Sequence, residues 1–424
     1  GVSTDVIDHV SQIGPVGGCV LVVGEDYGVS STTVAQRTLP WAMKSGILVV
    51  DPRADQQLLL RLTRESFDLS EASTCVVALL LRPQASHANA QVTVGDNRVG
   101  QYNVISKLKE GIKDPLRYPL PPNTQRQELE RYRDRLPKAR EYIVQHGLNE
   151  VFGPTDAPIG LITHGTVFNT VMRSLANLGL ADENGVTDPA ISVLQLNVVY
   201  PLCDDQIVDF IQGKREVLLV EEGQPDLMEQ QIRAMLHQRG VATPFHGHDL
   251  IPGVGELVPG RVLPALSEFL ARLLPDRADA IRAVSSGFMD RQKLAASLFP
   301  KPVTPRPPTF CTGCPERPVF SMMKINEMMT GQKDWHATDV GCYGMAGLAP
   351  FHMADSNMGM GGGLAAATAL SAMSEQKNVS VVGDGTLWHS ALNTCVVNGL
   401  YNKQDATYLV LDNKWTAMTG AHEN

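Results

Sequence analysis

The chain has 424 residues, of which 43% are hydrophobic and 19% charged, so it is long enough for several domains that each bury a core. Its formal net charge of −9 argues against nucleic-acid and anionic-membrane partners, because both need clustered basic residues. No run approaches the roughly 18 apolar residues of a membrane-spanning helix, and no signal-peptide pattern is present. Seven thinly spread cysteines are typical of a reducing cytoplasm. Because the sequence starts at Gly1 without Met and stops just after a glycine-containing loop, we expect both ends to be cut from a longer polypeptide.

Residues 1–83 alternate short apolar strands with helical stretches. We expect strands at 19–24, 47–50 and 75–81, and helices at 32–42 and 54–69. This alternation is typical of a parallel sheet with crossover helices. Residues 84–155 differ, because a polar stretch broken by prolines precedes a charged helical stretch at 125–146, and we interpret them as a connecting arm.

A second α/β module is expected within residues 156–300. The predicted strands are 159–163, 191–199 and 216–220, and the predicted helices 167–178 and 227–239 are each followed by a glycine. A proline-rich, stiff linker at 300–308 leads to a third module, residues 301–424. The predicted fold class is therefore α/β, with three successive modules of mainly parallel sheets.

The strongest local signal is the sequence VSVVGDG at 379–385. An apolar strand brings Gly383, Asp384 and Gly385 to its carboxyl end, and a helical stretch follows to about residue 401. The glycines permit close approach of a diphosphate, which the N-terminus of the next helix favours. Another strand, 407–413, brings Asn413 to the same edge, 29 residues after Asp384. One carboxylate, one amide oxygen and a loop carbonyl can hold Mg²⁺ there; the alternative is a plain turn with a loop-capping Asn413.

A second signal is the CxxC of residues 310–317 (FCTGCPER), with Cys342 in the sequence DVGCY 28 residues after Cys314. Thiolates are soft ligands that suit iron–sulfur clusters or zinc. From the residues alone, Cys311 and Cys314 also fit reduced structural thiols, a redox pair or half of a zinc site.

Five motifs in order carry a family resemblance: FCTGCPERPVF, DVGCY, MGMGGGLAAA, VVGDGTLWHS and LDNKWTAMTG. They resemble the catalytic region of indolepyruvate ferredoxin oxidoreductases in their long bacterial form, within the thiamine diphosphate-dependent 2-oxoacid:ferredoxin oxidoreductases. Looser similarity extends upstream, at 22–31 (VVGEDYGVSS), 219–222 (LVEE) and 255–257 (GEL). The resemblance implies three domains: the remainder of a pyrimidine-type domain (1–83), a transketolase-C-like domain (156–300) and a diphosphate-binding domain incomplete at its C-terminus (301–424).

The resemblance also implies roles for individual residues. Asp384, Asn413 and the backbone carbonyl of Trp415 match the family's Mg²⁺ ligands. Cys311, Cys314 and Cys342 match three ligands of a [4Fe–4S] cluster, whose fourth ligand lies downstream of the asparagine loop in relatives. The residues that match thiamine diphosphate contacts are Glu316, Cys342, Gly383, Asp384, Gly385, Thr386, Asn413, Trp415 and Met418.

Two assignments stay open. His352 is the one candidate catalytic residue, since a histidine in a similar place contacts substrate or phosphate in relatives; the alternative is a surface or packed histidine. The glutamate that activates the thiazolium lies upstream of this chain in the family, and Glu25 is not assigned to that role.

The resemblance implies oxidative decarboxylation of an aryl 2-oxo acid, such as indolepyruvate, to an acyl-CoA, with electrons passing through iron–sulfur centres to ferredoxin. The cofactor would do the bond chemistry while the protein orients and shields it. The implied partners are coenzyme A and ferredoxin, in a cytoplasmic homo-oligomer or a complex with a gamma-type subunit or domain. Two rival functions are a non-redox thiamine diphosphate-dependent decarboxylase or carboligase and a non-catalytic subunit with a vestigial cofactor fold.

Overall fold

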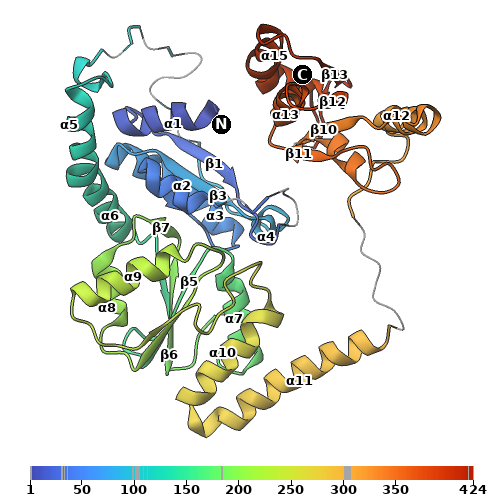
Figure 1. The fold of residues 1–424 in the computed structure, drawn as a ribbon. Helices are drawn as coiled ribbons and strands as arrows, with labels where there is room; N and C mark the ends of the chain where they lie inside the picture. Colours follow the sequence, from blue (N-terminus) through green and yellow to red (C-terminus); the bar gives the residue numbers. More distant parts are fainter. Residues whose placement is uncertain are drawn as a thin grey trace. The chain divides into compact units, whose positions relative to one another are not determined.

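The computed structural model describes residues 2–29, 32, 34–35, 37–97, 100, 106–107, 109–111, 113–182, 185–299, 307–418 and 420–423. Ser30 and Ser31 of the upstream motif and residues 300–306 of the predicted linker lie outside the described residues. The chain divides into two compact units, Gly1–Leu298 (unit 1) and Phe299–Asn424 (unit 2) (Figure 1). Among the described residues, no helix is both long enough and apolar enough to cross a lipid bilayer.

Unit 1 contains two sheets, with strand orders β1-β3-β2-β7 and β4-β6-β5-β8-β9. Neighbouring strands run parallel except that β7 is antiparallel to β2 and β4 is antiparallel to β6. The strands are β1 (Val20–Gly24), β2 (Leu48–Val50), β3 (Val77–Leu81), β4 (Glu150–Phe152), β5 (Ile159–His164), β6 (Ile191–Leu196), β7 (Val198–Tyr200), β8 (Glu216–Val220) and β9 (Phe245–His246).

Helices cover the faces of both sheets in unit 1 (Figure 1). They are α1 (Val2–Ile13), α2 (Thr38–Ser45), α3 (Gln56–Ser73), α4 (Pro83–Ser86), η1 (Pro115–Arg117), α5 (Asn123–Glu130), η2 (Arg131–Arg135), α6 (Leu136–Gln145), α7 (Val167–Asn177), α8 (Asp204–Ile211), α9 (Leu227–Gln238), α10 (Pro259–Leu273), η3 (Pro275–Arg277) and α11 (Ala278–Ser297). Apolar residues of α3 and α6 pack on the first sheet, and those of α7 and α10 pack on the second.

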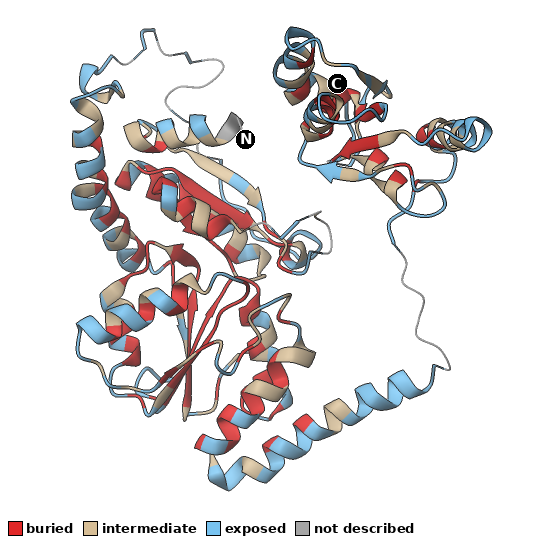
Figure 2. Cartoon of the chain, viewed as in Figure 1, coloured by how far each residue is buried: buried red, intermediate tan, exposed pale blue. Residues whose placement is uncertain are grey.

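One hydrophobic core is shared by the two sheets of unit 1. Ile47 and Val49 of the first sheet region and Ile162 and Leu194 of the second belong to the same buried cluster, together with residues of α2, α8 and α9. Figure 2 shows buried residues concentrated in the strands of both sheets. Because burial of apolar surface drives folding, this shared core holds the two sheets together as one unit.

The helix predicted at 32–42 begins later, at Thr38, and runs to Ser45. The reason is a cap: the backbone N–H of Thr38 donates to Oε2 of Glu25 at 3.2 Å, and the Thr38 hydroxyl donates to the same oxygen. Glu25 is buried, and it satisfies an N–H group that the first turn of α2 would otherwise leave unpaired. Glu25 therefore has a structural role at this position.

The strand predicted at 191–199 divides at the buried residue Asn197 into β6 and β7. Nδ2 of Asn197 donates to the Leu148 carbonyl and to the Glu150 carboxylate, both at 2.9 Å. The backbone carbonyl of Asn197 accepts the N–H of Asp51 at 2.8 Å. These bonds turn β7 away to pair with β2, while β4, which lies within the predicted arm, pairs with β6 in the second sheet.

A buried charged network lies where the carboxyl ends of both unit 1 sheets meet. Arg82, which follows β3, pairs with Asp51 after β2 at 2.5 Å and with Glu222 after β8. His164, the last residue of β5, accepts the N–H of Glu222 through Nε2 at 3.0 Å. Its Nδ1 must then carry the proton, which it donates to Oδ2 of Asp51 at 2.9 Å. Each sheet thus contributes charged groups to one network, which we call the Arg82 network.

The charge of Arg82 keeps Asp51 ionised within this network. Burial alone would raise the pKa of Asp51, but the Arg82 charge and the hydrogen bonds from His164 and Arg82 outweigh burial and lower the pKa to about 2. Glu222 gains a further donor, because Oε1 accepts the N–H of Leu257 at 2.6 Å.

Glu221, next to this network, makes unit 1 less stable as pH rises. Its carboxylate caps α9 by accepting the N–H groups of Met228 at 3.1 Å and Glu229 at 2.9 Å. Burial nevertheless raises the pKa of Glu221 to about 7. A carboxyl whose folded pKa lies above its unfolded value stabilises the fold below the unfolded pKa, and this contribution is lost as pH rises through the folded value.

We therefore expect Glu221→Gln to flatten the pH dependence of stability. Between pH 4.5 and pH 8, the unfolding free energy of the wild type should fall by up to about 3 kcal/mol more than that of the variant. Denaturant unfolding at both pH values measures this difference, with the exposed Glu128→Gln as control. Parallel pH profiles for wild type and Glu221→Gln would contradict it.

Unit 2 contains a parallel sheet of order β11-β10-β12-β13 and a small antiparallel pair, β14 and β15. Its strands are β10 (Trp335–Asp339), β11 (Ser356–Met358), β12 (Asn378–Gly383), β13 (Ala406–Leu411), β14 (Trp415–Thr416) and β15 (His422–Glu423). Its helices are α12 (Glu316–Thr330), η4 (Cys342–Gly347), α13 (Gly362–Ser371), α14 (Asp384–Thr386), η5 (Leu387–Val396) and α15 (Val397–Tyr401). The predicted fold class, α/β with mainly parallel sheets, is confirmed.

Candidate functional site

The candidate site lies at the carboxyl edge of the unit 2 sheet. Gly383, the last residue of β12, pairs in register with Leu411, the last residue of β13. The loops that follow the two strands therefore start at the same level, and Asp384 and Asn413 lie on neighbouring loops. Ligands of open α/β sheets bind at this edge.

Asp384, which is 4% exposed, holds these two loops together. Its Oδ1 accepts the N–H of Gly385 at 2.9 Å, and its Oδ2 accepts the N–H of Lys414 at 2.7 Å. Oδ1 of Asn413 accepts the N–H of Trp415 at 2.9 Å, while Lys414 adopts a left-handed backbone with φ of 62°. Each of these oxygens keeps a lone pair, so the donor set fits a hard cation such as Mg²⁺.

Two helices begin at this edge of the sheet. α14 starts at Asp384 directly after β12 and continues through η5 and α15, as the sequence predicted for a helical stretch to about residue 401. α13 starts at Gly362 within the glycine run 359–363. A Cβ on Gly363 would lie 2.9 Å from the backbone of Thr338, so only glycine lets α13 approach β10 this closely. The positive end of a helix dipole lies at each of these helix starts, and it favours an anion such as a diphosphate.

Glu316, the first residue of α12, is buried beside Asp384. The side chain is 6% exposed, and its Oε2 has no hydrogen-bond partner among the described residues. Burial raises the pKa of the Glu316 carboxyl, and the negative charge of Asp384 raises it further. Asp384 is hydrogen-bonded to two backbone N–H groups, whereas Oε2 of Glu316 has no partner among the described residues. Burying carboxylates without a counter-charge is costly, so two adjacent ones indicate a site for a positively charged group. Mg²⁺ and a thiazolium ring both meet this description.

We expect Glu316→Gln to stabilise unit 2 in the absence of cofactor while weakening its cofactor binding. Removing an unpaired buried charge should raise the free energy of unfolding by about 1 kcal/mol. Denaturant unfolding of the apoprotein measures this gain, and Glu375→Gln, at an exposed position of the same unit, is the matched control. A Glu316→Gln apoprotein that is less stable than the wild type would show that the carboxylate is paired in the fold.

The three predicted cluster cysteines lie in one neighbourhood of unit 2. Cys311 and Cys314 form a turn before α12, in which the N–H of Cys314 donates to the Cys311 carbonyl at 3.2 Å. Burial raises the pKa of the Cys342 thiol, and the nearby Glu316, Cys314 and Cys311 raise it further. Cys311 is exposed, however, and within the described part of the chain no three His, Cys, Asp or Glu side chains are arranged to hold a metal ion. Three thiols are also one fewer than a Cys₄ cluster needs.

The remaining predicted residues occupy different places. Thr386 is buried next to Asp384, whereas Trp415 and Met418 are exposed on the segment that follows Asn413. His352 is exposed and lies on the segment that enters β11 at its amino end, where the N–H of Asp355 donates to the His336 carbonyl at 2.7 Å. The carboxyl edge thus brings together Glu316, Asp384, Thr386 and Asn413, but the segment of His352 leads to the opposite end of the sheet.

Two buried residues at this edge, Asp339 and Tyr343, were not predicted from the sequence as site residues. Asp339 ends β10, and its Oδ2 accepts the N–H of Gly361 in the glycine run at 2.7 Å. The Tyr343 hydroxyl donates to Oδ1 of Asp339 and lies 3.1 Å from Oγ1 of Thr386. Burial raises the pKa of Asp339 to about 6, although both hydrogen bonds oppose the rise. The sequence pattern that could have predicted them is an aspartate at a strand end with a tyrosine four residues later. Both lie in the motif DVGCY, which was interpreted only through Cys342.

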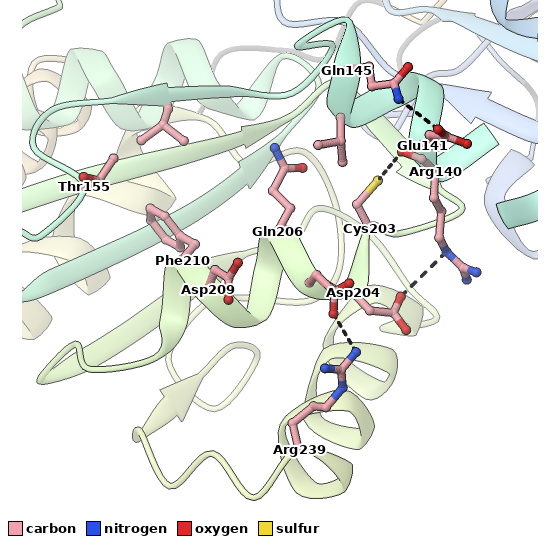
Figure 3. Close-up of a pocket in the computed structure, with 13 residues that line it drawn as sticks. Arg140, Glu141, Gln145, Thr155, Cys203, Asp204, Gln206, Asp209, Phe210 and Arg239 are labelled. Carbon is pink, nitrogen blue, oxygen red and sulfur yellow. Dashed lines mark hydrogen bonds and ion pairs between the residues drawn. The ribbon is translucent and has the colours of Figure 1, made fainter. Parts of the chain in front are cut away.

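A large cavity elsewhere does not form the candidate site. It has a volume of about 810 Å³ and lies in unit 1 among α6, β4 and α8 (Figure 3). Arg140 lies 3.8 Å from Asp204 at its rim, and Arg239 donates to Asp205 at 2.6 Å. Burial raises the pKa of Cys203 in its lining to about 12, so this thiol is protonated and unreactive near neutral pH.

Two protein-family models match parts of the chain. Residues 148–242 match the indolepyruvate ferredoxin oxidoreductase middle domain, from just before β4 to just after α9. Residues 339–424 match the C-terminal TPP-binding domain of thiamine pyrophosphate enzymes. This second match contains Asp339, the glycine run, Asp384 and Asn413, so it covers most of the carboxyl edge described above.

Curated relatives match the chain along its whole length. The indolepyruvate oxidoreductase subunit IorA of Thermococcus kodakarensis is 28% identical over 426 residues, which cover 97% of this chain and 62% of the relative. The same subunit of Pyrococcus abyssi is 28% identical over 444 residues, which cover 100% of this chain and 64% of the relative. The chain therefore spans less than two thirds of the length of these relatives.

Among solved structures, a 2-oxoglutarate:ferredoxin oxidoreductase from Magnetococcus marinus, with 2-oxoglutarate, coenzyme A and succinyl-CoA bound, aligns with a TM-score of 0.41. The sequence identity is 15%, and the alignment covers 63% of this chain and 52% of the other.

Proposed function

We propose that this chain, a relative of the IorA subunits of indolepyruvate oxidoreductase, binds thiamine diphosphate with Mg²⁺ and serves the oxidative decarboxylation of a 2-oxo acid. The observation that carries the proposal is the pair of buried carboxylates, Glu316 and Asp384, at the carboxyl edge of the unit 2 sheet. Their joint negative charge lies beside the GDG loop, where family resemblance and helix N-termini both favour a metal-bound diphosphate.

Each residue at the edge has a role in this proposal. Asp384, Asn413 and the Trp415 carbonyl would bind Mg²⁺, while the backbone at Gly383 and Gly385 and the start of α13 would hold the diphosphate. When bound, thiamine diphosphate supplies the electron sink that decarboxylation of a 2-oxo acid needs. Glu316 would offset the positive charge of the cofactor, and the exposed Trp415 and Met418 would cover it from solvent.

The electron-transfer half of the reaction has less support in the described residues. Cys311, Cys314 and Cys342 would supply three thiolates to a [4Fe–4S] cluster, and the fourth ligand would come from outside the described residues. Ferredoxin and coenzyme A would be the partners and an aryl 2-oxo acid the substrate, in a cytoplasmic oligomer or a complex with a gamma-type subunit. The proposal retains a pyrimidine-type domain (1–83), a transketolase-C-like domain (156–300) and a diphosphate-binding domain (301–424).

Anaerobic turnover tests the proposal. The protein, supplied with thiamine diphosphate, Mg²⁺, coenzyme A and ferredoxin, should reduce ferredoxin with a 2-oxo acid, and indolepyruvate should exceed pyruvate and 2-oxoglutarate in kcat/KM. Asp384→Ala should abolish this turnover. Release of CO₂ without ferredoxin reduction would instead indicate a non-redox decarboxylase or carboligase, and an Asp384→Ala variant with wild-type turnover would overturn the site assignment.

A further inference from the structure

Hydrogen bonds through the hydroxyl of Tyr343 and the carboxylate of Asp339 link three segments at the carboxyl edge of unit 2. It donates to Oδ1 of Asp339, at the end of β10, and it lies 3.1 Å from Oγ1 of Thr386, in the loop that contains Asp384. The other oxygen of Asp339 accepts the N–H of Gly361, in the glycine run before α13, at 2.7 Å. A chain of hydrogen bonds therefore runs from the glycine run through Asp339 and Tyr343 to the GDG loop.

The direction of these hydrogen bonds follows from the groups involved. Above about pH 6 the Asp339 carboxyl is mostly ionised and can only accept, so the Tyr343 hydroxyl donates its proton to Asp339. The Tyr343 oxygen then accepts from Thr386, whose hydroxyl proton is committed to the interior of the fold. Thr386 consequently cannot donate its hydroxyl to a diphosphate while this chain of bonds is intact. The loop can still offer its backbone N–H groups.

Packing restricts the position of the Tyr343 ring as well. The side chain is 4% exposed and belongs to the hydrophobic cluster of unit 2 that includes Phe320 and Val381. A Cβ on Gly383 would lie 3.0 Å from Cε1 of the ring, so the ring lies directly against the first residue of the GDG sequence. Movement of the ring would therefore displace the loop whose aspartate we assign to Mg²⁺.

We infer that Tyr343 is a positioning residue, which acts through Thr386 and Asp339 to fix the GDG loop and the glycine run at the spacing that a diphosphate needs. The inference rests on the proposed function. Binding is tighter when the loops need no ordering on arrival of the ligand, so loss of this bridge should appear as weaker cofactor affinity. In this interpretation the Thr386 side chain supports the loop, and backbone groups contact the diphosphate.

Calorimetric titration of the full chain with thiamine diphosphate at saturating Mg²⁺ tests the inference, with denaturant unfolding as the second readout. Tyr343→Phe and Thr386→Val should each weaken affinity about tenfold, the change expected from one hydrogen bond of about 1.4 kcal/mol. The double variant should bind about as well as each single variant, because both changes break the same bond. Thr386→Ser keeps the hydroxyl and should bind with wild-type affinity. If Tyr343→Phe fails to fold, the comparison of Thr386→Ser with Thr386→Val tests the inference.

Tyr408→Phe is the matched control. The hydroxyl of Tyr408 in β13 bonds the hydroxyl of Thr368 in α13, which is the same pair of groups in the same unit. This variant should lose a similar amount of stability and keep wild-type affinity. Three outcomes would overturn this inference and leave the proposed function standing. They are unchanged binding by Tyr343→Phe, additive losses of affinity in the double variant, and a loss of affinity in Tyr408→Phe equal to that in Tyr343→Phe. A wild type that does not bind thiamine diphosphate would overturn both the proposed function and this inference.

Discussion

Replacing Arg82 by methionine should lower the free energy of unfolding of unit 1 by about 3–5 kcal/mol, because it leaves buried carboxylates without their counter-charge. Arg82 is 1% exposed, and it pairs with Asp51 and Glu222, which come from different sheets. The guanidinium also lies 4.3 Å from the centre of the Tyr27 ring. Methionine fills a similar volume, so most of the loss would be electrostatic.

Denaturant unfolding measures the Arg82→Met effect, and pH supplies a second check. Without Arg82, the pKa of Asp51 should rise from about 2, since burial would then dominate. Protonation of Asp51 would relieve the unpaired charge, so the deficit should be smaller at pH 5 than at pH 8. Arg133→Met, which removes a solvent-exposed pair with Asp134, should leave stability almost unchanged. Equal losses in the two variants would show that the Arg82 network does not join the sheets.

Replacing Asp384 by alanine should weaken Mg²⁺-dependent binding of thiamine diphosphate by at least about 100-fold. Changes to groups that merely support metal ligands already cost 10- to 100-fold in affinity, and Asp384 is assigned as a ligand itself. The change also removes the acceptor for the N–H groups of Gly385 and Lys414, so the two loops lose their link.

Asp405→Ala is the matched control for Asp384→Ala. Asp405 is exposed just before β13 in the same unit, and its replacement should leave affinity unchanged. Asp384→Asn separates charge from geometry, because an amide oxygen still accepts one hydrogen bond. It should bind more weakly than the wild type and more tightly than Asp384→Ala. Wild-type affinity in Asp384→Ala would contradict the assignment of this residue to Mg²⁺.

The parallel fold and the meeting of Asp384 with Asn413 could be predicted from the sequence, because both depend on local patterns. Short apolar strands that alternate with helices predict parallel sheets, and the carboxyl ends of neighbouring parallel strands necessarily share an edge. In the structure, Gly383 pairs in register with Leu411, so the two strands end at the same edge.

Contacts between segments that are distant in the sequence could not be predicted in the same way. Thr386 lies 43 residues from Tyr343, and no periodicity relates the two. The burial of Glu316 beside Asp384 likewise depends on how α12 packs, although family resemblance had marked the residue. The break at Asn197 could not be predicted for another reason. The stretch 191–199 is mostly apolar and has the composition of one strand, and only the hydrogen bonds of the Asn197 side chain and backbone carbonyl divide it.

Titration of the wild-type protein with thiamine diphosphate, in excess Mg²⁺ and again in excess EDTA, shows whether the carboxyl edge of unit 2 binds a diphosphate through the metal. We expect one binding site per chain in Mg²⁺ and its loss in EDTA, because Asp384, Asn413 and the Trp415 carbonyl would reach the diphosphate only through the metal. Equal binding under both conditions, or no binding under either, would contradict a metal-bound diphosphate at the carboxyl edge of unit 2.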